Sequence, residues 1–144
     1  MKNDENKIST ERRNLLISVS VDILGIVIER GFISINSYFD DNKLIEKDSV
    51  YEYFKNGLQF IIEGAYPNKL SLLLEIEKAQ WIKDANKNIE DLQLITIIQY
   101  IIPCIQTLDI VSFRDICHHF TERDKYSEIH YRIHNIEQYL QKQK

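Results

Sequence analysis

The sequence predicts an all-α protein, a compact helical bundle of five to seven helices. Apolar residues recur at helical spacing along most of the chain, and glycine, proline and small polar residues stand where helices would begin or end. The 144 residues fit one domain, because domains cluster at about 100 to 150 residues. With 44% hydrophobic and 28% charged residues, the chain can bury enough apolar area to fold. We expect a flexible polar lead at 1–9 and a single helical domain at 10–144.

The segment 15–39 is compatible with two structures. Its apolar and polar residues alternate in part as they would in a strand, and this pattern favours a hairpin. A helix explains the same segment, and the apolar residues that would share one helical face are Leu16, Val19, Ile23 and Val27. An α+β fold with an N-terminal hairpin at about 15–39 is therefore the alternative to the all-helical bundle.

A helix is expected over about 49–63. Ser49 stands three residues before Glu52, which is the spacing of a capping box, where each side chain satisfies a free amide of the first turn. Gly64 can end this helix in the left-handed conformation.

Pro67 can begin the next helix, expected from 68 to about 84. The buried face predicted for this helix comprises Leu70, Leu73, Leu74, Ile76, Trp81 and Ile82.

The most apolar part of the chain predicts a central helix. Asn88 can cap a helix that begins at Ile89, and apolar residues then cover nearly every face as far as Ile102. Pro103 should kink or end this helix, because proline lacks an amide donor. Asp109 can cap a further helix, whose apolar face would be Ile110, Phe113, Cys117 and Phe120.

An amphipathic helix is expected near the C-terminus. Its apolar stripe is Ile129, Ile133, Ile136 and Leu140. Such a stripe either completes the protein's own core or packs against a partner. Ile133, Ile136 and Leu140 are therefore candidate interaction residues for a protein partner or for self-association as a homodimer.

The bulk properties argue against several classes of protein. The net charge of −4 gives no global positive field that would attract nucleic acid or an anionic membrane. The chain starts with polar residues rather than the apolar run of a secretory signal. Its most apolar run, 92–105, is shorter than the ~20 residues of a membrane span. Cys104 and Cys117 lie among apolar residues, as buried thiols do. We expect a soluble, cytoplasmic protein without membrane insertion and without a cofactor.

Several short stretches between about residues 17 and 79 form a pattern. They are Arg-Gly-Phe-Ile-Ser-Ile at 30–35, Phe-Lys-Asn-Gly-Leu-Gln at 54–59, Glu-Gly at 63–64, Pro67 and Leu-Glu-Ile-Glu at 74–77. This pattern resembles the cytoplasmic segment of MotA-type flagellar stator proteins, in the MotA/TolQ/ExbB group of ion-driven membrane motors. The resemblance implies a surface that binds a protein partner.

The chain also departs from this family. The family's segment is flanked by membrane helices that carry the ion path, and no stretch of this sequence is apolar enough to supply them. Family members contact the rotor through an arginine before the glycine and an acid after the apolar run, whereas Ile28 and Asn36 stand at those distances from Gly31. The resemblance therefore implies a non-catalytic interaction or adaptor module, a soluble relative of the stator segment. This is the preferred function.

A second pattern lies at 114–119, where Arg114 is followed by Asp115, three more residues and His119. An arginine can stabilise charge on a phosphate, and a histidine can move a proton near neutral pH. The spacing resembles the Arg-x4-His motif of HEPN ribonucleases, which implies metal-independent cleavage by a dimer. Thr121 stands where these enzymes often have a tyrosine. The alternative function is a HEPN-like ribonuclease or toxin that acts on RNA through Arg114 and His119.

Basic and aromatic residues alternate after this motif. Arg123, Lys125 and Arg132 could contact phosphates, while Tyr126 and Tyr131 could stack on bases of single-stranded RNA. Three acidic residues in the same segment dilute the positive charge. A solvated surface of mixed charge is the simpler interpretation.

His130 and His134 are four residues apart and would share a helical face, which is the spacing of helical metal sites. His118 or Cys117 could add a ligand if the preceding helix packs alongside. A metal-binding regulator is therefore a third and weaker hypothesis.

Overall fold

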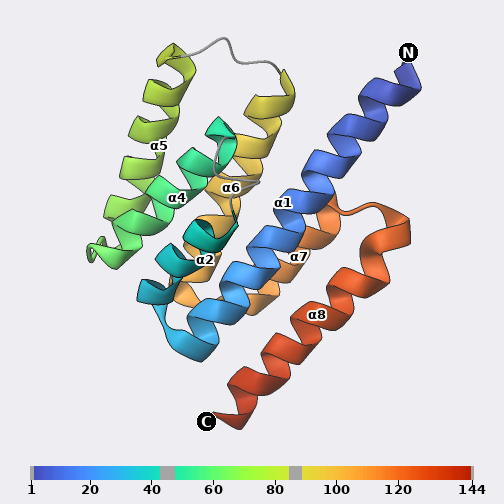
Figure 1. The fold of residues 1–144 in the computed structure, drawn as a ribbon. Coiled ribbons are helices and arrows are strands. Elements are labelled where there is room, and N and C mark those ends of the chain that lie inside the picture. Colours follow the sequence, from blue (N-terminus) through green and yellow to red (C-terminus); the bar gives the residue numbers. More distant parts are fainter. Residues whose placement is uncertain (1, 43–47, 85–88, 144) are drawn as a thin grey trace.

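The computed structural model describes residues 2–42, 48–84 and 89–143, and over these ranges the protein is an all-α bundle (Figure 1). The elements are α1 (Lys2–Arg30), the 3₁₀ turn η1 (Phe32–Ser34), α2 (Ile35–Asp41), α4 (Ser49–Ile62), α5 (Pro67–Asp84), α6 (Ile89–Thr107), α7 (Ile110–Phe120) and α8 (Arg123–Lys142). The described ranges contain no strand, so the predicted bundle of five to seven helices is confirmed. Within them, no helix combines the length and the apolar run that crossing a bilayer requires.

The N-terminal hairpin is wrong, because α1 runs unbroken to Arg30 and is followed by η1 and α2. A helix buries both of the alternating apolar series on one broad face, and the buried residues are Leu16, Ile17, Val19, Val21, Ile23, Leu24 and Val27. Ser20 is buried among them and its Oγ donates to the carbonyl of Leu16 at 2.7 Å, so no polar group is stranded there. The helical backbone of α1 begins at Lys2.

The central helix of the bundle is α6, which contacts α1, α4, α5 and α7 (Figure 1). Its buried residues are Leu94, Ile95, Ile97, Ile98, Ile101, Ile102, Cys104 and Ile105. The helix does not end at Pro103 and continues to Thr107. A proline inside a helix costs about 3 kcal/mol or more, because a backbone hydrogen bond is lost. Ile105, beyond the proline, is fully buried, and its place in the core favours continuing the helix.

The observed helix caps agree only in part with those that the sequence predicts. Asp48, not Ser49, caps α4, and its carboxylate accepts from the amide of Val50 at 3.0 Å. The predicted capping box is therefore wrong by one residue, since Asp and Ser are equally good caps. Gly64 has a φ of 94° after α4, as predicted, and Asp109 caps α7 by accepting from the amide of Ser112 at 3.1 Å. The proposed cap Asn88 lies outside the described residues.

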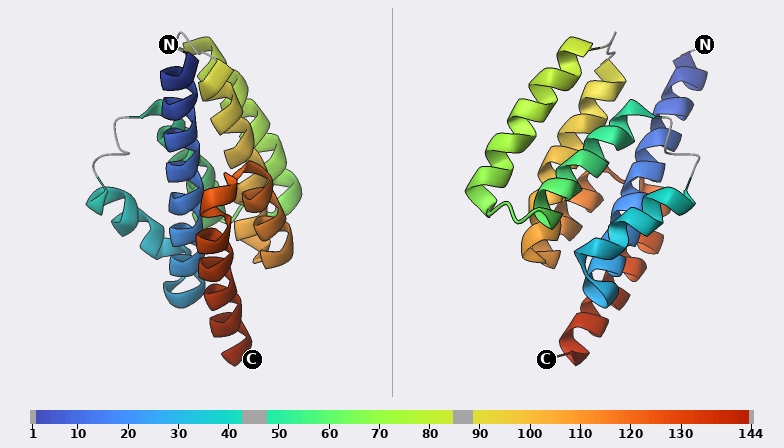
Figure 2. Two further views of the ribbon diagram at one scale, coloured as in Figure 1. Left: turned by 90° about the vertical axis from the view of Figure 1, so that its right-hand side faces the viewer. Right: turned by 60° about the vertical axis from the view of Figure 1, so that its left-hand side comes forward.

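Only half of the predicted buried face of α5 is buried. Leu70, Leu74 and Trp81 lie in the core, and Trp81 Nε1 donates to the carbonyl of Ser49 at 3.2 Å. Ile76 and Ile82 are 55% and 45% exposed, so their assignment to the core is wrong. This helix lies at the edge of the bundle beside α4 and α6 (Figures 1 and 2), and it has apolar residues on both its inner and its outer side.

Arg12 ties α1 to the beginnings of two other helices. Its guanidinium lies 3.1 Å from the carboxylate of Asp48, which caps α4, and 2.8 Å from that of Asp91 in the first turn of α6. Glu90, also in the first turn of α6, lies 3.5 Å from the same group. The arginine and the three carboxylates thus fix three helices relative to one another. The carboxylates also interact favourably with the dipoles of the helices that they begin.

Gly57 is the point of closest approach between α4 and its neighbours. A Cβ built at this buried position would overlap the Cδ1 atom of Ile102 on α6 and lie 2.9 Å from Leu74 Cδ2 on α5. Glycine therefore allows the close approach of the three helices here, and an added methyl group would displace the ends of the Ile102 and Leu74 side chains. The φ of Gly57 is not in the left-handed region, so backbone conformation does not call for glycine. This accounts in physical terms for the glycine within the stretch 54–59.

Gly57→Ala should lower the free energy of unfolding by about 1–3 kcal/mol, because the added methyl group overpacks the contact with α5 and α6. Gly25→Ala is the matched control. Its Cβ would lie 3.5 Å from Ile136 Cδ1, which is an ordinary contact, and alanine in mid-helix should stabilise the protein by about 0.5–1 kcal/mol. Urea denaturation followed by circular dichroism measures both values. Equal effects of the two substitutions would contradict the close contact at Gly57.

Candidate functional site

All four histidines of the chain lie on two helices that pack against each other, α7 and α8. His118 and His119 stand in the last turn of α7, and His130 and His134 are one helical turn apart on α8. Figure 2 shows α8 running along one side of the bundle, beside α1. The histidines are thus concentrated at this side of the protein.

Three rings meet between α7 and α8, and we call them the ring cluster: His118, Tyr126 and His130. The centroid of the His118 ring lies 4.0 Å from that of Tyr126 and 5.3 Å from that of His130. The rings of Tyr126 and His130 are parallel to within 5° and their centroids are 6.5 Å apart. The sequence did not reveal this cluster, because it depends on how α7 packs on α8. The one signal available was the spacing of four between Tyr126 and His130.

His118 is held toward its neutral form. Its Nε2 atom is covered and has no hydrogen-bond partner. Burial lowers the pKa of His118, the positive charges of His130 and Arg114 lower it further, and Asp115 opposes them. The protonated form of His118 is therefore disfavoured, because its charge would be partly buried and close to other positive groups.

An open depression of about 480 Å³ adjoins the ring cluster. Its lining residues all come from α8: Tyr126, Ser127, His130, Tyr131 and His134. Tyr131 is 66% exposed and Tyr126 is 43% exposed, so flat side chains face solvent here. Large exposed aromatic groups of this kind are more typical of recognition surfaces than of a bare helix face.

His130 and His134 share the exposed side of α8, as their spacing predicts, and both border the depression. In the described part of the chain, however, no three His, Cys, Asp or Glu side chains are grouped as ligands of a metal ion. His118 stacks on His130 at an interplanar angle of 27°, so the two rings do not aim their nitrogens at one common point. The metal site at His130 and His134 stays a prediction.

Arg114 and His119, the candidate catalytic pair, lie on α7 but take part in different contacts. Arg114 Nη1 donates to Glu137 of α8 at 3.4 Å, whereas His119 is exposed with its ring against Phe120. Residues five apart on a helix are rotated by roughly 140° about its axis. Within one chain, the two side chains therefore do not meet at a single phosphate. The ribonuclease stays a prediction, and it requires a second copy of the chain.

The candidate interaction residues on α8 belong mainly to the core. Ile133 is fully buried, and Ile136 and Leu140 are partly buried and packed against the core cluster. The apolar stripe of α8 thus completes the protein's own core. Ile133 has no surface left to offer a partner while α8 stays in place.

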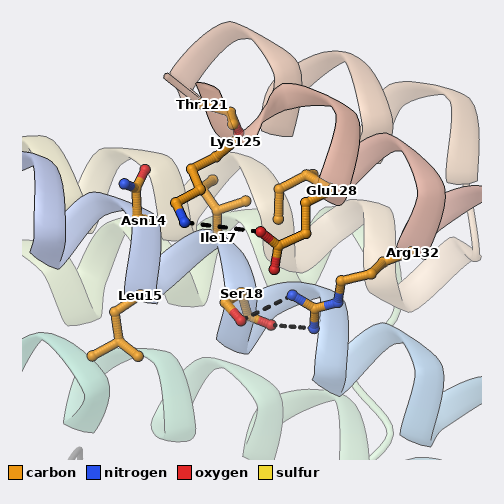
Figure 3. Close-up of a pocket in the computed structure, with 9 residues that line it drawn as sticks. Asn14, Leu15, Ile17, Ser18, Thr121, Lys125, Glu128 and Arg132 are labelled. Carbon is orange, nitrogen blue, oxygen red and sulfur yellow. Dashed lines mark hydrogen bonds and ion pairs between the residues drawn. The ribbon is translucent and has the colours of Figure 1, made fainter. Parts of the chain in front are cut away.

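A cleft of about 220 Å³ lies between α1 and α8 (Figure 3). On its α8 side, Lys125 Nζ lies 4.0 Å from Glu128, and Arg132 Nη1 donates to Ser18 Oγ of α1 at 2.9 Å. A further nitrogen of Arg132 contacts Asp22 at 2.6 Å. Arg132, which the sequence offered as a phosphate contact, is therefore engaged in holding α8 against α1.

Neither cysteine is disposed to act as a nucleophile. Both side chains are buried and free. Burial raises the pKa of Cys104 to about 11 and that of Cys117 to about 12. Because the thiolate is the reactive form, these residues serve as small apolar side chains, as the sequence indicated.

We predict that the protein becomes less stable as the pH falls from about 7 to about 5. The folded pKa of His118 lies below the unfolded value of about 6.5, so the unfolded chain binds the proton more readily. The contribution of His118 is fully present above pH 6.5 and is lost progressively below it. His118→Phe keeps a ring in the cluster but cannot be protonated, and it should flatten the dependence of unfolding free energy on pH.

The matched control is His119→Phe, which replaces the exposed neighbour by the same ring. Chemical denaturation at a series of pH values measures the slopes. The assignment fails if His118→Phe and the unmodified protein lose stability in parallel on acidification.

No protein-family model, no curated protein and no solved structure matches this chain. The resemblances to stator segments and to HEPN ribonucleases therefore rest on the quoted residues alone.

Proposed function

We propose that this protein is a non-catalytic interaction or adaptor module, akin to a stator cytoplasmic segment, whose protein partner packs on the outer face of α5. One observation supports this most directly. Leu72 and Ile76 are 60% and 55% exposed and stand one turn apart, while Leu70 and Leu74 on the opposite side of the same helix are fully buried. A helix that is apolar on both sides at the edge of a bundle offers its outer side to another apolar surface.

The orientation of α5 is fixed by polar contacts on both flanks. On the side of α4, Asn56 Nδ2 donates to Glu77 Oε1 at 3.0 Å. On the side of α6, Lys78 Nζ donates to Gln99 Oε1 at 3.2 Å, and Gln99 Nε2 donates to Glu75. Rolling the helix to bury Leu72 and Ile76 would break these bonds, so the outer face stays presented to solvent.

The proposed surface falls within the segment that resembles the stator proteins. Both Leu72 and Ile76 lie between residues 17 and 79, and Ile76 belongs to the stretch at 74–77. Arg114, one of the two candidate catalytic groups, is paired with Glu137, and this supports an adaptor more than a ribonuclease. Binding rather than chemistry is therefore the function that these contacts favour.

Leu72→Glu and Ile76→Glu, alone and together, should abolish recovery of the partner from cells while changing the free energy of unfolding by only about 0.5 kcal/mol each. A charge on the outer face opposes burial against an apolar surface, but it leaves the core intact. Cross-linking followed by affinity purification and mass spectrometry identifies the partner and measures its yield.

Two further variants separate binding from folding. Val111→Glu adds the same charge at a position that is also 55% exposed but lies on α7, and it should leave the yield unchanged. Leu74→Ala removes a fully buried side chain and should cost about 2–5 kcal/mol. If the double variant at Leu72 and Ile76 recovers the same partner in the same yield as Val111→Glu, the outer face of α5 is not the binding surface.

A further inference from the structure

The outer face of α5 carries a regular row of exposed side chains. From the N-terminal end of the helix, the row comprises Lys69, Leu72, Ile76, Ala79 and Lys83. The intervals within it alternate between three and four residues, so the five side chains form one stripe along the helix. The stripe is about 21 Å long, because a helix rises 1.5 Å per residue. It faces away from α4 and α6, against which α5 packs at the edge of the bundle (Figures 1 and 2).

The spacing of this row favours an α-helix as the occupant. Intervals that alternate between three and four residues are those at which a second helix packs along the first. The small side chain of Ala79 follows Leu72 and Ile76 in the row, and a partner helix can therefore approach closely. The apolar part is a single row, which is narrower than the apolar face of a helix that lies in a membrane surface.

Positive charge at both ends of the row defines the partner further. Lys69 and Lys83 stand at opposite ends, and neither forms an ion pair with another residue that the structure describes. The acids in the middle of α5, Glu75 and Glu77, are bonded to α6 and α4. The outer face thus offers apolar contact in its middle and an ammonium group at each end.

A second copy of this chain fits the row poorly. In a parallel pair of α5 helices, each lysine would face its own equivalent. In an antiparallel pair, Lys69 would face Lys83 at both ends. Like charges at such positions are unfavourable, whereas acids in the same places would make both contacts attractive.

We propose that the outer face of α5 binds an amphipathic α-helix of another protein, which has apolar residues at alternating intervals of three and four and an acidic residue near each end. This proposal rests on the proposed function and adds the chemistry of the partner. Leu72 and Ile76 supply most of the affinity, and pairing with the two lysines sets the register of the partner along α5. Because the net charge is −4, the lysines act at short range and do not attract acids from a distance.

Selection from a displayed library of helical peptides tests this chemistry. The library is randomised at the apolar positions and at both ends, and the purified protein serves as bait. The double variant Leu72→Glu with Ile76→Glu removes clones that bind elsewhere on the protein. We expect the retained clones to carry apolar residues at the alternating spacing and Asp or Glu at both ends.

A peptide from this selection then measures the contribution of the lysines by isothermal titration calorimetry. Lys69→Glu with Lys83→Glu should weaken its binding at least about tenfold, because two attractive pairs become repulsive. The same peptide with lysine in place of its terminal acids should restore binding to this variant. Arg123→Glu with Lys142→Glu is the matched control and should retain the affinity. It changes the net charge equally at exposed positions of α8, which packs on α1 and α7.

The possible failures are distinguishable. Clones that depend on Leu72 and Ile76 but show no preference for acids at their ends, or equal binding by the two charge-reversed variants, would overturn this proposal and leave the proposed function intact. If no clone depends on Leu72 and Ile76, the outer face of α5 is not a binding surface, and the proposed function fails as well.

Two other occupants give different results. Self-association in analytical ultracentrifugation that is lost in Leu72→Glu with Ile76→Glu would assign the face to a second copy. Co-sedimentation with phosphatidylserine vesicles that is lost in the same variant would assign it to a membrane surface. Either result would overturn the assignment to an acidic helix.

Discussion

The bundle depends on the burial of α6, which among the helices of the described residues is the one that is apolar on most of its circumference. Each helix that contacts it, namely α1, α4, α5 and α7, must turn an apolar face inward, and this requirement sets the arrangement of the rest. The close approach of α4 is helped by Gly57, which carries no side chain where Ile102 packs. The same demand for burial carries α6 past Pro103 to Thr107, against the local preference of the sequence.

Local sequence patterns predicted most of the helices. They failed where two local conformations had nearly equal energies. Gly64 and Asp109 act as predicted, because a left-handed glycine and a capping carboxylate need only their own neighbours. The N-cap of α4 is Asp48 rather than the predicted Ser49. Adjacent residues of equal capping strength cannot be ranked without knowing the path of the chain. Residues 15–39 alternate like a strand, yet α1 gains more from one broad buried face. On α5, apolar residues on both sides gave no periodic signal to separate Leu74 in the core from Ile76 outside it.

The candidate site could be predicted only to the level of one helix. The spacing of His130 and His134 correctly placed both on the exposed side of α8, because a helix fixes relations between residues four apart. The ring of His118 against Tyr126 and His130 could not be foreseen, since it depends on the packing of α7 on α8. Arg114 and Arg132 show the same limit, because their partners Glu137 and Ser18 are 23 and 114 residues away in the chain.

The pairing of α1 with α8 has a consequence for how the protein is made. Arg132 bonds Ser18 and Asp22 across separations of 114 and 110 residues, and Ile136 packs beside Gly25. Contacts of such long range close a large loop, and the entropy of closing it must be lost before the contacts form. During synthesis, the apolar surface of α1 that α8 covers must wait until α8 has left the ribosome. Until then this apolar surface stays exposed to water, and exposed apolar surface in a partly folded chain favours aggregation.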